Sequence, residues 1–211
     1  MTRLLLLLER LAALIQQGLR ESAGQHGLQP VHLLILAYLE RANRYSDIPI
    51  AIAEYLGITR GPLSQSLAVL EAKGLIEREP DAKDGRIQHI RLRDPARELL
   101  RESWLARLSM ALQGLPQAAA LEQGLALLLA EMQQLNRHQA FGICRSCAHF
   151  QPIGEGAGRC GLTGDALSLA DSEKLCREWT DPSASSRSSP AAGSSPGAPK
   201  ASPPTAETGA T

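Results

Sequence analysis

Residues 59–74 read TRGPLSQSLAVLEAKG, which combines an apolar stripe on one side with almost no charge on the other. The spacing i, i+4 and i+7, typical of one buried helix face, is occupied by Leu63, Leu67 and Leu70. Thr59 is a suitable N-cap residue, and Gly74 is a typical residue just beyond a helix C-terminus. The sequence therefore predicts one amphipathic helix between them.

The face opposite the leucines is narrow, small and polar. It carries Gly61, Gln65, Ala68 and Ala72, flanked by Arg60 and Ser64. A helix that enters the major groove of DNA has a width of only ~12 Å available, so small residues allow close approach while a few polar groups read the bases. Gln65 suits adenine, Arg60 suits guanine or a phosphate, and Ala68 can touch a thymine methyl group. Candidate donors to phosphates or base edges are Thr59, Ser64 and Ser66. An ordinary amphipathic surface helix has the same pattern, so the flanking segments must decide.

The flanking segments predict helices followed by a hairpin. We expect three helices before the stretch, over residues 4–23, 29–43 and 47–56. We expect two short strands after it, around the turn PDAKDGR, over residues 75–79 and 87–92. Asp47 is the expected cap of the third helix, with Pro49 in its first turn. Helices followed by a small hairpin form a winged helix-turn-helix pattern.

The hairpin turn carries Lys83 and Arg86. Such cations suit a narrow minor groove, where the potential of DNA is most negative. The alternative for this turn is a solvated loop with no ligand. Beyond the hairpin, two long helices rich in Leu and Ala are expected over residues 94–113 and 116–138. So small a domain offers them few partners, and a dimer interface would bury them.

The stretch LGITRGPLSQSLAVLEAKGLIEREPDAKDGR, followed by IQHIRL, resembles the MarR family of winged-helix transcription regulators. The matching features are Leu56-Gly57-Ile58, Ser64, Leu70-Glu71, Lys73-Gly74-Leu75-Ile76, Arg78 and the wing pattern Asp84-x-Arg86. The resemblance implies a homodimer that places two recognition helices in successive major grooves of a pseudo-palindromic operator. It also implies that Arg86 reaches the minor groove and that Asp84 steadies this arginine. The sequence departs from the family after Leu92, where Arg93-Asp94-Pro95-Ala96 replaces the usual Leu-Thr and glycine.

The family commonly binds small phenolic or lipophilic effectors between its dimerisation helices and its DNA-binding lobe. Aromatic residues make up only 3% of this chain. A stacking pocket for aromatic compounds is therefore not evident, and the sequence identifies no effector.

A second feature is a group of cysteines spaced C-x2-C-x12-C-x15-C, namely Cys144, Cys147, Cys160 and Cys176. Four thiolates satisfy a closed tetrahedral zinc site or hold a small iron–sulfur cluster, and a CxxC pair supplies two ligands from one tight turn. The module also resembles small four-cysteine modules that carry iron–sulfur clusters. We expect one metal centre per chain, zinc or a cluster, because so small a unit has few apolar residues to fold it. His149 is an alternative ligand.

Composition limits the remaining choices. The formal net charge of the 211 residues is zero, so any nucleic-acid role needs a local basic patch. Glu9 and Arg10 interrupt the N-terminal leucines before a signal sequence or membrane span could form, which favours a cytoplasmic protein without membrane contact. In a reducing compartment, metal binding is favoured over disulfides.

These observations predict a mainly α fold with a small β-hairpin wing, a winged helix-turn-helix flanked by dimerisation helices. The expected units are a MarR-like domain over residues 1–140 (winged helix about 28–93), a four-cysteine module over 141–180 and a disordered Pro/Ser/Ala/Gly-rich tail over 181–211. The expected function is sequence-specific binding of double-stranded DNA by a homodimeric regulator that responds to redox or metal state.

Two alternatives remain open. One is a winged-helix interaction protein that does not bind DNA. The other is a thiol oxidoreductase using Cys144 and Cys147, which is disfavoured because this CxxC follows a helix rather than the strand–helix context that activates a thiolate. We expect no enzyme.

Overall fold

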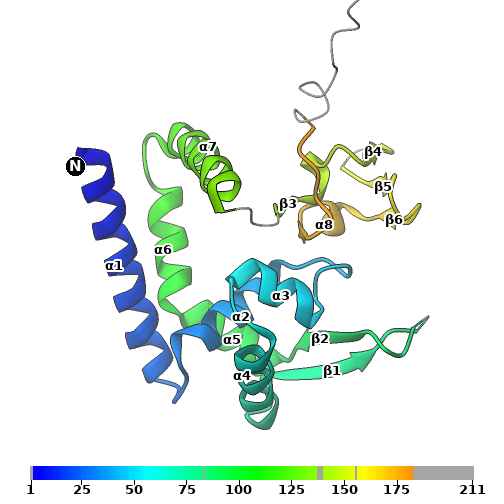
Figure 1. Cartoon of the computed structure of the whole chain (residues 1–211), viewed down its shortest axis with the longest axis horizontal. Helices are drawn as coiled ribbons and strands as arrows, with labels where there is room; N and C mark the ends of the chain where they lie inside the picture. Colours follow the sequence, from blue (N-terminus) through cyan, green and yellow to red (C-terminus); the bar gives the residue numbers. More distant parts are fainter. Residues whose placement is uncertain (1, 83, 137–139, 155, 183–211) are drawn as a thin grey trace, which may run out of the picture.

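The computed structural model describes residues 2–82, 84–136, 140–154 and 156–182 (Figure 1). The first part comprises α1 (Arg3–Gly24), α2 (Pro30–Arg41), α3 (Pro49–Leu56), α4 (Arg60–Ala72), β1 (Ile76–Pro80), β2 (Gln88–Leu92), α5 (Asp94–Glu102), α6 (Trp104–Gln113) and α7 (Ala118–Asn136). The second part comprises β3 (Gly142–Ile143), the 3-10 turn η1 (Cys144–Ser146), β4 (Phe150–Pro152), β5 (Gly158–Cys160), β6 (Ala166–Leu167), α8 (Leu169–Ser172) and β7 (Leu175–Cys176). The predicted fold class is confirmed: the molecule is mainly helical with a small antiparallel hairpin. The tail predicted over residues 181–211 lies outside the described residues from residue 183 onward.

The winged helix is built around one apolar core. Its centre is formed by fully buried side chains of α2, α3, α4 and both strands, namely Leu33, Ile35, Leu36, Ile52, Leu63, Leu67, Leu70, Ile76 and Ile90. Strands β1 and β2 pair antiparallel from Ile76 opposite Leu92 to Pro80 opposite Gln88. The hydroxyl of Tyr38 is buried with this core and donates to the Ser46 carbonyl at 2.7 Å. This bond fixes the loop between α2 and α3.

Helix α4 forms as the sequence predicts. Leu63, Leu67 and Leu70 are at most 2% exposed, so the leucine stripe faces the core. Thr59 occupies the N-cap position, although its side chain makes no capping hydrogen bond. Gly74 ends the element with φ of 68°, a left-handed conformation that glycine adopts without strain.

Two predicted helix boundaries are wrong. Asp47 does not cap α3, whose N-cap is Ile48, because its carboxylate binds β2 instead. The helix predicted over residues 94–113 is broken at Ser103, which is extended with ψ of 161°. The Ser103 hydroxyl donates to the Leu100 carbonyl and accepts from the Ala106 amide, so it ends α5 and caps α6 at once. The helix predicted from Pro116 begins at Ala118, and its predicted end at 137–138 lies outside the described residues.

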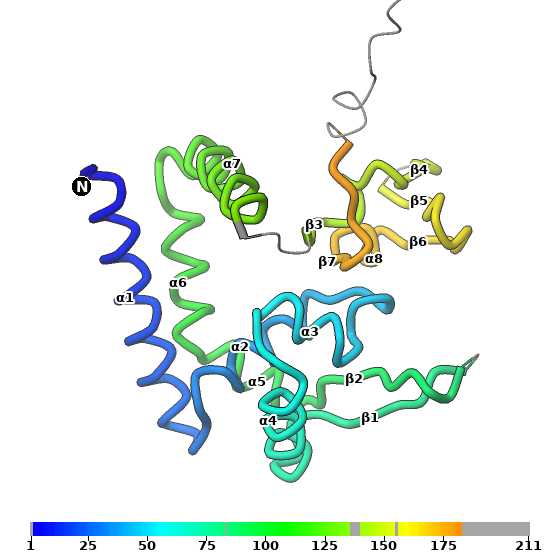
Figure 2. Tube along the Cα trace, in the orientation of Figure 1, coloured from blue at the N-terminus to red at the C-terminus, as the bar shows by residue number. Residues whose placement is uncertain are grey.

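Helices α1, α6 and α7 extend away from the winged helix (Figure 2). Helix α6 runs beside α1, where the Trp104 ring covers Gly18 and the Trp104 amide donates to the Ser22 hydroxyl at 3.2 Å. No residue of α6 is buried, and most leucines of α7 are exposed. Among the helices described, none is long and apolar enough to cross a membrane.

The cysteine-containing unit over residues 141–180 folds into two small antiparallel sheets, β3–β7 and β4–β5–β6. It rests on the loop between α2 and α3. Here the Asn43 amide donates to the Leu175 carbonyl at 2.9 Å, and the Tyr45 hydroxyl donates to Asp165 at 2.6 Å. Arg177 holds the Glu54 carboxylate of α3 with two guanidinium nitrogens.

Candidate functional site

The uncharged face of α4 is open to solvent. Exposed residues on or beside it include Thr59, Arg60, Gly61, Ser64, Gln65, Ala68 and Ala72. Helix α4 forms one end of the winged helix, next to the hairpin (Figure 1). These side chains are therefore accessible to a partner, and their contact with DNA stays a prediction.

One predicted residue does not belong to this face. Ser66 is only 8% exposed, and its hydroxyl donates to the Pro62 carbonyl one turn earlier at 3.0 Å. It lies beside the leucine stripe, so its predicted role as a donor to DNA is wrong. A hydroxyl bonded to its own helix backbone is a common arrangement for an inward-facing serine.

A groove of about 420 Å³ separates α4 from the hairpin and the start of α3. Apolar side chains form its floor, and its polar lining residues are Arg60, Ser64, Arg78, Arg86 and Gln88. Three guanidinium groups from α4, β1 and the wing turn thus surround one opening. The formal net charge of the whole chain is zero. The groove is therefore a local basic patch on a chain whose formal net charge is zero.

Arg78 was named from the sequence only among the features of the family resemblance and Gln88 was not named, so neither was a predicted site residue. Arg78 is exposed and forms an ion pair with Glu71 of α4 at 3.0 Å, which connects this helix to the hairpin. Gln88 opens β2 and donates to the Gly85 carbonyl at 3.3 Å. The signal available in the sequence was their position on strands that flank the basic turn.

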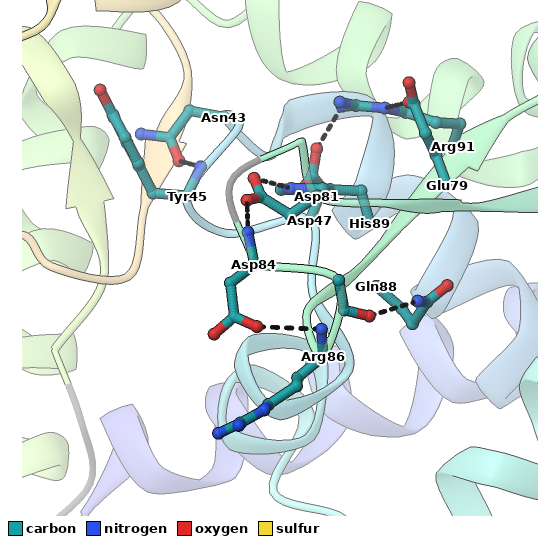
Figure 3. Close-up of polar contacts among 11 residues, drawn as sticks. Asn43, Tyr45, Asp47, Glu79, Asp81, Asp84, Arg86, Gln88, His89 and Arg91 are labelled. Carbon is teal, nitrogen blue, oxygen red and sulfur yellow. Dashed lines mark hydrogen bonds and ion pairs between the residues drawn. The ribbon is translucent and has the colours of Figure 1, made fainter.

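The wing turn is held by hydrogen bonds from its backbone amides to its own aspartate side chains. Asp84 accepts the Arg86 amide at 3.0 Å, and the Asp84 amide donates to Asp81 at 2.8 Å (Figure 3). In Figure 3 the dashed line from the Asp84 carboxylate ends at the Arg86 backbone nitrogen and not at its guanidinium group. Asp84 therefore steadies Arg86 through its backbone amide. Lys83 lies outside the described residues.

Behind the wing, a buried carboxylate ties the hairpin to the loop between α2 and α3. Asp47 is 3% exposed and binds His89 Nδ1 at 2.5 Å as well as the Arg91 guanidinium (Figure 3). His89 Nε2 also contacts Asp81 at 3.1 Å. Burial alone would lower the pKa of His89, but its hydrogen bonds to Asp47 and Asp81 outweigh burial and raise it. The Asp47 carbonyl completes the connection by accepting the Ile90 amide at 2.7 Å.

The exposed helix face, the basic groove and the ordered wing can be set against known proteins. Residues 26–87 match the model of the MarR family. The match spans α2, α3, α4, β1 and the wing turn. The chain is also similar to two solved structures. One is the transcription regulator MarR from Oenococcus oeni PSU-1, at 20% identity and a TM-score of 0.50 over 62% of this chain and 98% of that one.

The other is a MarR transcriptional regulator from Methanosarcina mazei Go1, at 16% identity and a TM-score of 0.50 over 60% of this chain and 94% of that one. At such identities the likeness establishes the MarR fold. No curated protein matches the chain.

The four cysteines come together although they lie on separate elements. Cys144 begins η1, Cys147 follows it, and Cys160 and Cys176 end β5 and β7. All four, with His149, line one cavity of about 40 Å³, and all four are free thiols. Cys144 and Cys176 are buried. In addition, the Thr180 amide donates to the Cys147 sulfur at 3.4 Å.

The thiols influence one another across this cavity. The pKa of Cys144 is raised by its hydrogen bond to Cys176, by burial and by the other thiols. The pKa of Cys176 is lowered by its hydrogen bond with Cys144 and, against burial, by the side-chain amide of Asn43. Within the described ranges, no group of three or more His, Cys, Asp or Glu side chains is arranged to hold a metal ion. The thiols thus share one cavity without forming a ligated geometry.

Proposed function

We propose that this chain is a sequence-specific, double-stranded DNA-binding transcription regulator of the MarR type. The observation that carries the proposal is the groove between α4 and the hairpin, where Arg60, Arg78 and Arg86 surround an exposed helix face of small residues. The match of residues 26–87 to the MarR family supports it. Three arginines around a narrow face of small residues favour an anionic partner over the alternative of an ordinary surface helix.

The proposed docking follows from the dimensions of DNA. Helix α4 enters the major groove, where Gln65 and Arg60 read base edges and Ala68 contacts a thymine methyl group. Thr59 and Ser64 donate to phosphates, which fix the register without reading sequence. Arg86 at the hairpin turn enters the adjacent minor groove, where the negative potential is greatest.

A homodimer is part of this proposal. Exposed apolar side chains cluster on α1, α6 and α7, including Leu4, Leu7, Leu11, Met110, Leu127 and Leu135. Apolar surface of this extent on neighbouring helices is typical of a protein interface. A two-fold dimer places two copies of α4 about 34–36 Å apart, one helical turn of DNA, and so reads a pseudo-palindromic operator. No residue of the groove indicates a small-molecule effector.

The experiment begins by selecting an operator from random duplexes with the full chain. Arg86→Ala is expected to weaken binding to that operator at least about fivefold and to lower its salt-dependence slope by about one, because one cation fewer displaces counterions. Arg101→Ala, at an exposed arginine of α5 that does not line the groove, is the matched control. If the selection yields no sequence and the chain shows no affinity for DNA at low salt, the proposal is overturned in favour of a winged-helix interaction protein that does not bind DNA.

We propose in addition that the four cysteines bind one metal ion. The four thiols already line a single cavity, and the Thr180 backbone amide already donates to the Cys147 sulfur. Four cysteines are a usual ligand set for structural zinc. A cavity of about 40 Å³ has room for only a few water-sized spheres, which favours a single zinc ion over a multi-iron cluster. Zinc would draw the thiols into tetrahedral geometry and displace their protons.

The metal proposal is tested on protein purified without oxygen. One zinc per chain in a colourless protein supports it, and loss of zinc in Cys160→Ser, with the melting temperature lowered, confirms the ligand role. Iron and sulfide in the purified protein, together with visible absorption, would show that the centre is an iron–sulfur cluster and not zinc. Protein that takes up neither zinc nor iron overturns the centre, and turnover of a disulfide substrate would instead support the oxidoreductase alternative.

A regulatory response is the final step of the proposal. If metal occupancy or thiol oxidation alters the position of the cysteine unit on the winged helix, operator affinity changes with it. Titration of the operator with metal-loaded and metal-free protein measures this response directly, and equal affinities would refute it.

A further inference from the structure

The loop between α2 and α3, residues 42–48, contacts the cysteine unit on one side. The backbone amide of Asn43 donates to the Leu175 carbonyl at 2.9 Å, and Ala42 forms a β-bridge with Leu175. The Ser46 hydroxyl accepts the Arg177 amide at 2.8 Å. Residues on both sides of Cys176 are therefore bonded directly to this loop.

The same loop contacts the wing on its other side. Asp47 accepts the Ile90 amide through its carbonyl, and its buried carboxylate binds His89 and Arg91. Only three residues separate Asn43 from Asp47 along the chain. A displacement of this loop where it meets the cysteine unit would therefore also move Asp47, which holds strand β2 of the wing.

Asn43 is the buried polar residue of this loop that follows the bridge to Leu175, the residue before Cys176. Its side chain is 1% exposed, and its Oδ1 accepts the Tyr45 amide at 3.0 Å and the Ser46 hydroxyl at 2.8 Å. Its Nδ2 is buried without a hydrogen-bond acceptor in the described part of the chain. A buried donor left unpaired is unfavourable, so such a group in a folded protein calls for a partner. The Cys176 sulfur is the neighbouring acceptor: Leu175 is bonded backbone to backbone to Asn43, and the Asn43 side-chain amide acts on the Cys176 thiol although no hydrogen bond of ordinary distance and angle joins the two.

We propose that the Asn43 side-chain amide donates a hydrogen bond to the metal-bound Cys176 thiolate, and that this bond links occupancy of the cysteine centre to the wing. The inference rests on the proposed metal centre. A neutral thiol is a weak acceptor, whereas a metal-bound thiolate carries the negative charge that an amide N–H satisfies. Metal binding thus gives the orphaned donor its partner and fixes the loop on which the wing is held.

Asn43 is accordingly a positioning residue and not a metal ligand. Hydrogen bonds to metal ligands typically change metal affinity 10- to 100-fold when they are removed. Coupling between two sites is reciprocal, so metal and operator must change each other's affinity by the same factor. For coupling of typical strength this factor is about fivefold or more.

The test variant is Asn43→Asp in the full chain. It keeps the Oδ1 acceptor for Tyr45 and Ser46 but replaces the Nδ2 donor by an oxygen that repels a thiolate. The control is Tyr45→Phe, which removes the hydroxyl bonds to Asp165 and Thr163 at the same junction and keeps the aromatic ring that packs beside the cysteines. The probes are Zn²⁺ alone, in competition with a chromophoric chelator, and Co²⁺, whose thiolate charge-transfer band reports the ligand environment.

The expected result is zinc binding 10- to 100-fold weaker in Asn43→Asp, a shifted cobalt band and loss of the zinc effect on operator affinity. Tyr45→Phe is expected to keep zinc affinity within about threefold, since the bonds that it removes are partly exposed and go to Asp165 and Thr163 rather than to a thiol. Unchanged zinc affinity and an unchanged cobalt band in Asn43→Asp would overturn the inference while leaving the metal centre intact. A wild-type chain that binds no metal overturns the metal centre itself, which separates the two failures.

A measurement on the wild-type chain covers the case in which Asn43→Asp does not fold. The Asn43 side-chain amide resonances, assigned in ¹⁵N-labelled protein, are expected to shift on addition of Zn²⁺ and to exchange with solvent more slowly. Resonances that do not respond to stoichiometric zinc, while the cysteine signals do, would refute the hydrogen bond.

Discussion

At the scale of single residues, Gln65 is the side chain of α4 best suited to read sequence. It is exposed in the middle of the helix and uncharged. Gln65→Ala is therefore expected to remove discrimination at one operator position, about 1–3 kcal/mol. Affinity for random DNA and its salt dependence should stay unchanged, since no cation is lost. Titration of the operator and its single-base variants measures both quantities, and an equal loss on all sequences would show that Gln65 does not read a base.

His89 makes the attachment of the wing dependent on pH. Its pKa in the folded state is raised above the ordinary 6.5 because the protonated ring binds Asp47 and Asp81. Its stabilising effect is therefore fully present below pH 6.5 and is lost as the pH rises through the raised value. Arg91 also faces Asp47 and partly opposes protonation.

The corresponding variant is His89→Gln, which keeps polarity and removes the titration. The wild-type chain is expected to lose unfolding free energy between pH 6 and pH 8.5 relative to this variant. Urea unfolding of both proteins at the two pH values gives the difference. His26→Gln, at an exposed histidine outside the cluster, serves as the control. A pH dependence that survives in His89→Gln would assign the effect to another group.

At the scale of elements, the packing of α1 against α6 depends on one glycine. A Cβ atom at Gly18 would lie 2.3 Å from the Trp104 ring, which is far inside van der Waals contact. Gly18→Ala is thus expected to force Trp104 out of its position and to destabilise the fold by about 1–3 kcal/mol. Gly24→Ala, at the end of the same helix, has open space at its Cβ and should be neutral or stabilising by up to about 1 kcal/mol. Chemical denaturation of both variants tests the contrast, and equal stabilities would contradict it.

The sequence predicted those elements whose determinants are local. The leucine stripe and Gly74 defined α4, and the polar turn PDAKDGR defined the hairpin, because periodicity and turn chemistry act within a few residues. The break at Ser103 was missed because the same hydroxyl can continue, cap or end a helix. Only the approach of Trp104 to α1 favours the break over continuation.

In the candidate site too, the sequence predicted only those features that depend on neighbouring residues. Residues on the outer face of α4 follow from helical spacing, so Arg60, Gln65 and Ala68 were placed correctly. Ser66 was misjudged because it borders the buried stripe, where a serine can satisfy its hydroxyl within the helix. Asp47 was read as a cap because no local pattern reveals that His89, 42 residues later, will lie beside it. Contacts of this range require the folded chain.

At the scale of the whole molecule, the exposed apolar surface of α1, α6 and α7 predicts a dimer. Leu127 in α7 is 72% exposed, and a charge at this position would be buried unpaired in an interface. Leu127→Glu is therefore expected to convert the dimer to a monomer at micromolar concentration. Ile153→Glu, at a 59% exposed apolar residue of the cysteine unit, is the control and should remain dimeric.

Operator binding extends this prediction from assembly to function. Two linked winged helices bind a palindrome far more tightly than one, because the second half-site is bound at high effective concentration. Leu127→Glu should therefore bind the palindromic operator at least about 100-fold more weakly, with little change on a single half-site. Sedimentation velocity and titration of both duplexes measure the two effects. A wild-type chain that sediments as a monomer, or a Leu127→Glu variant that keeps full operator affinity, would show that the exposed leucines serve another contact.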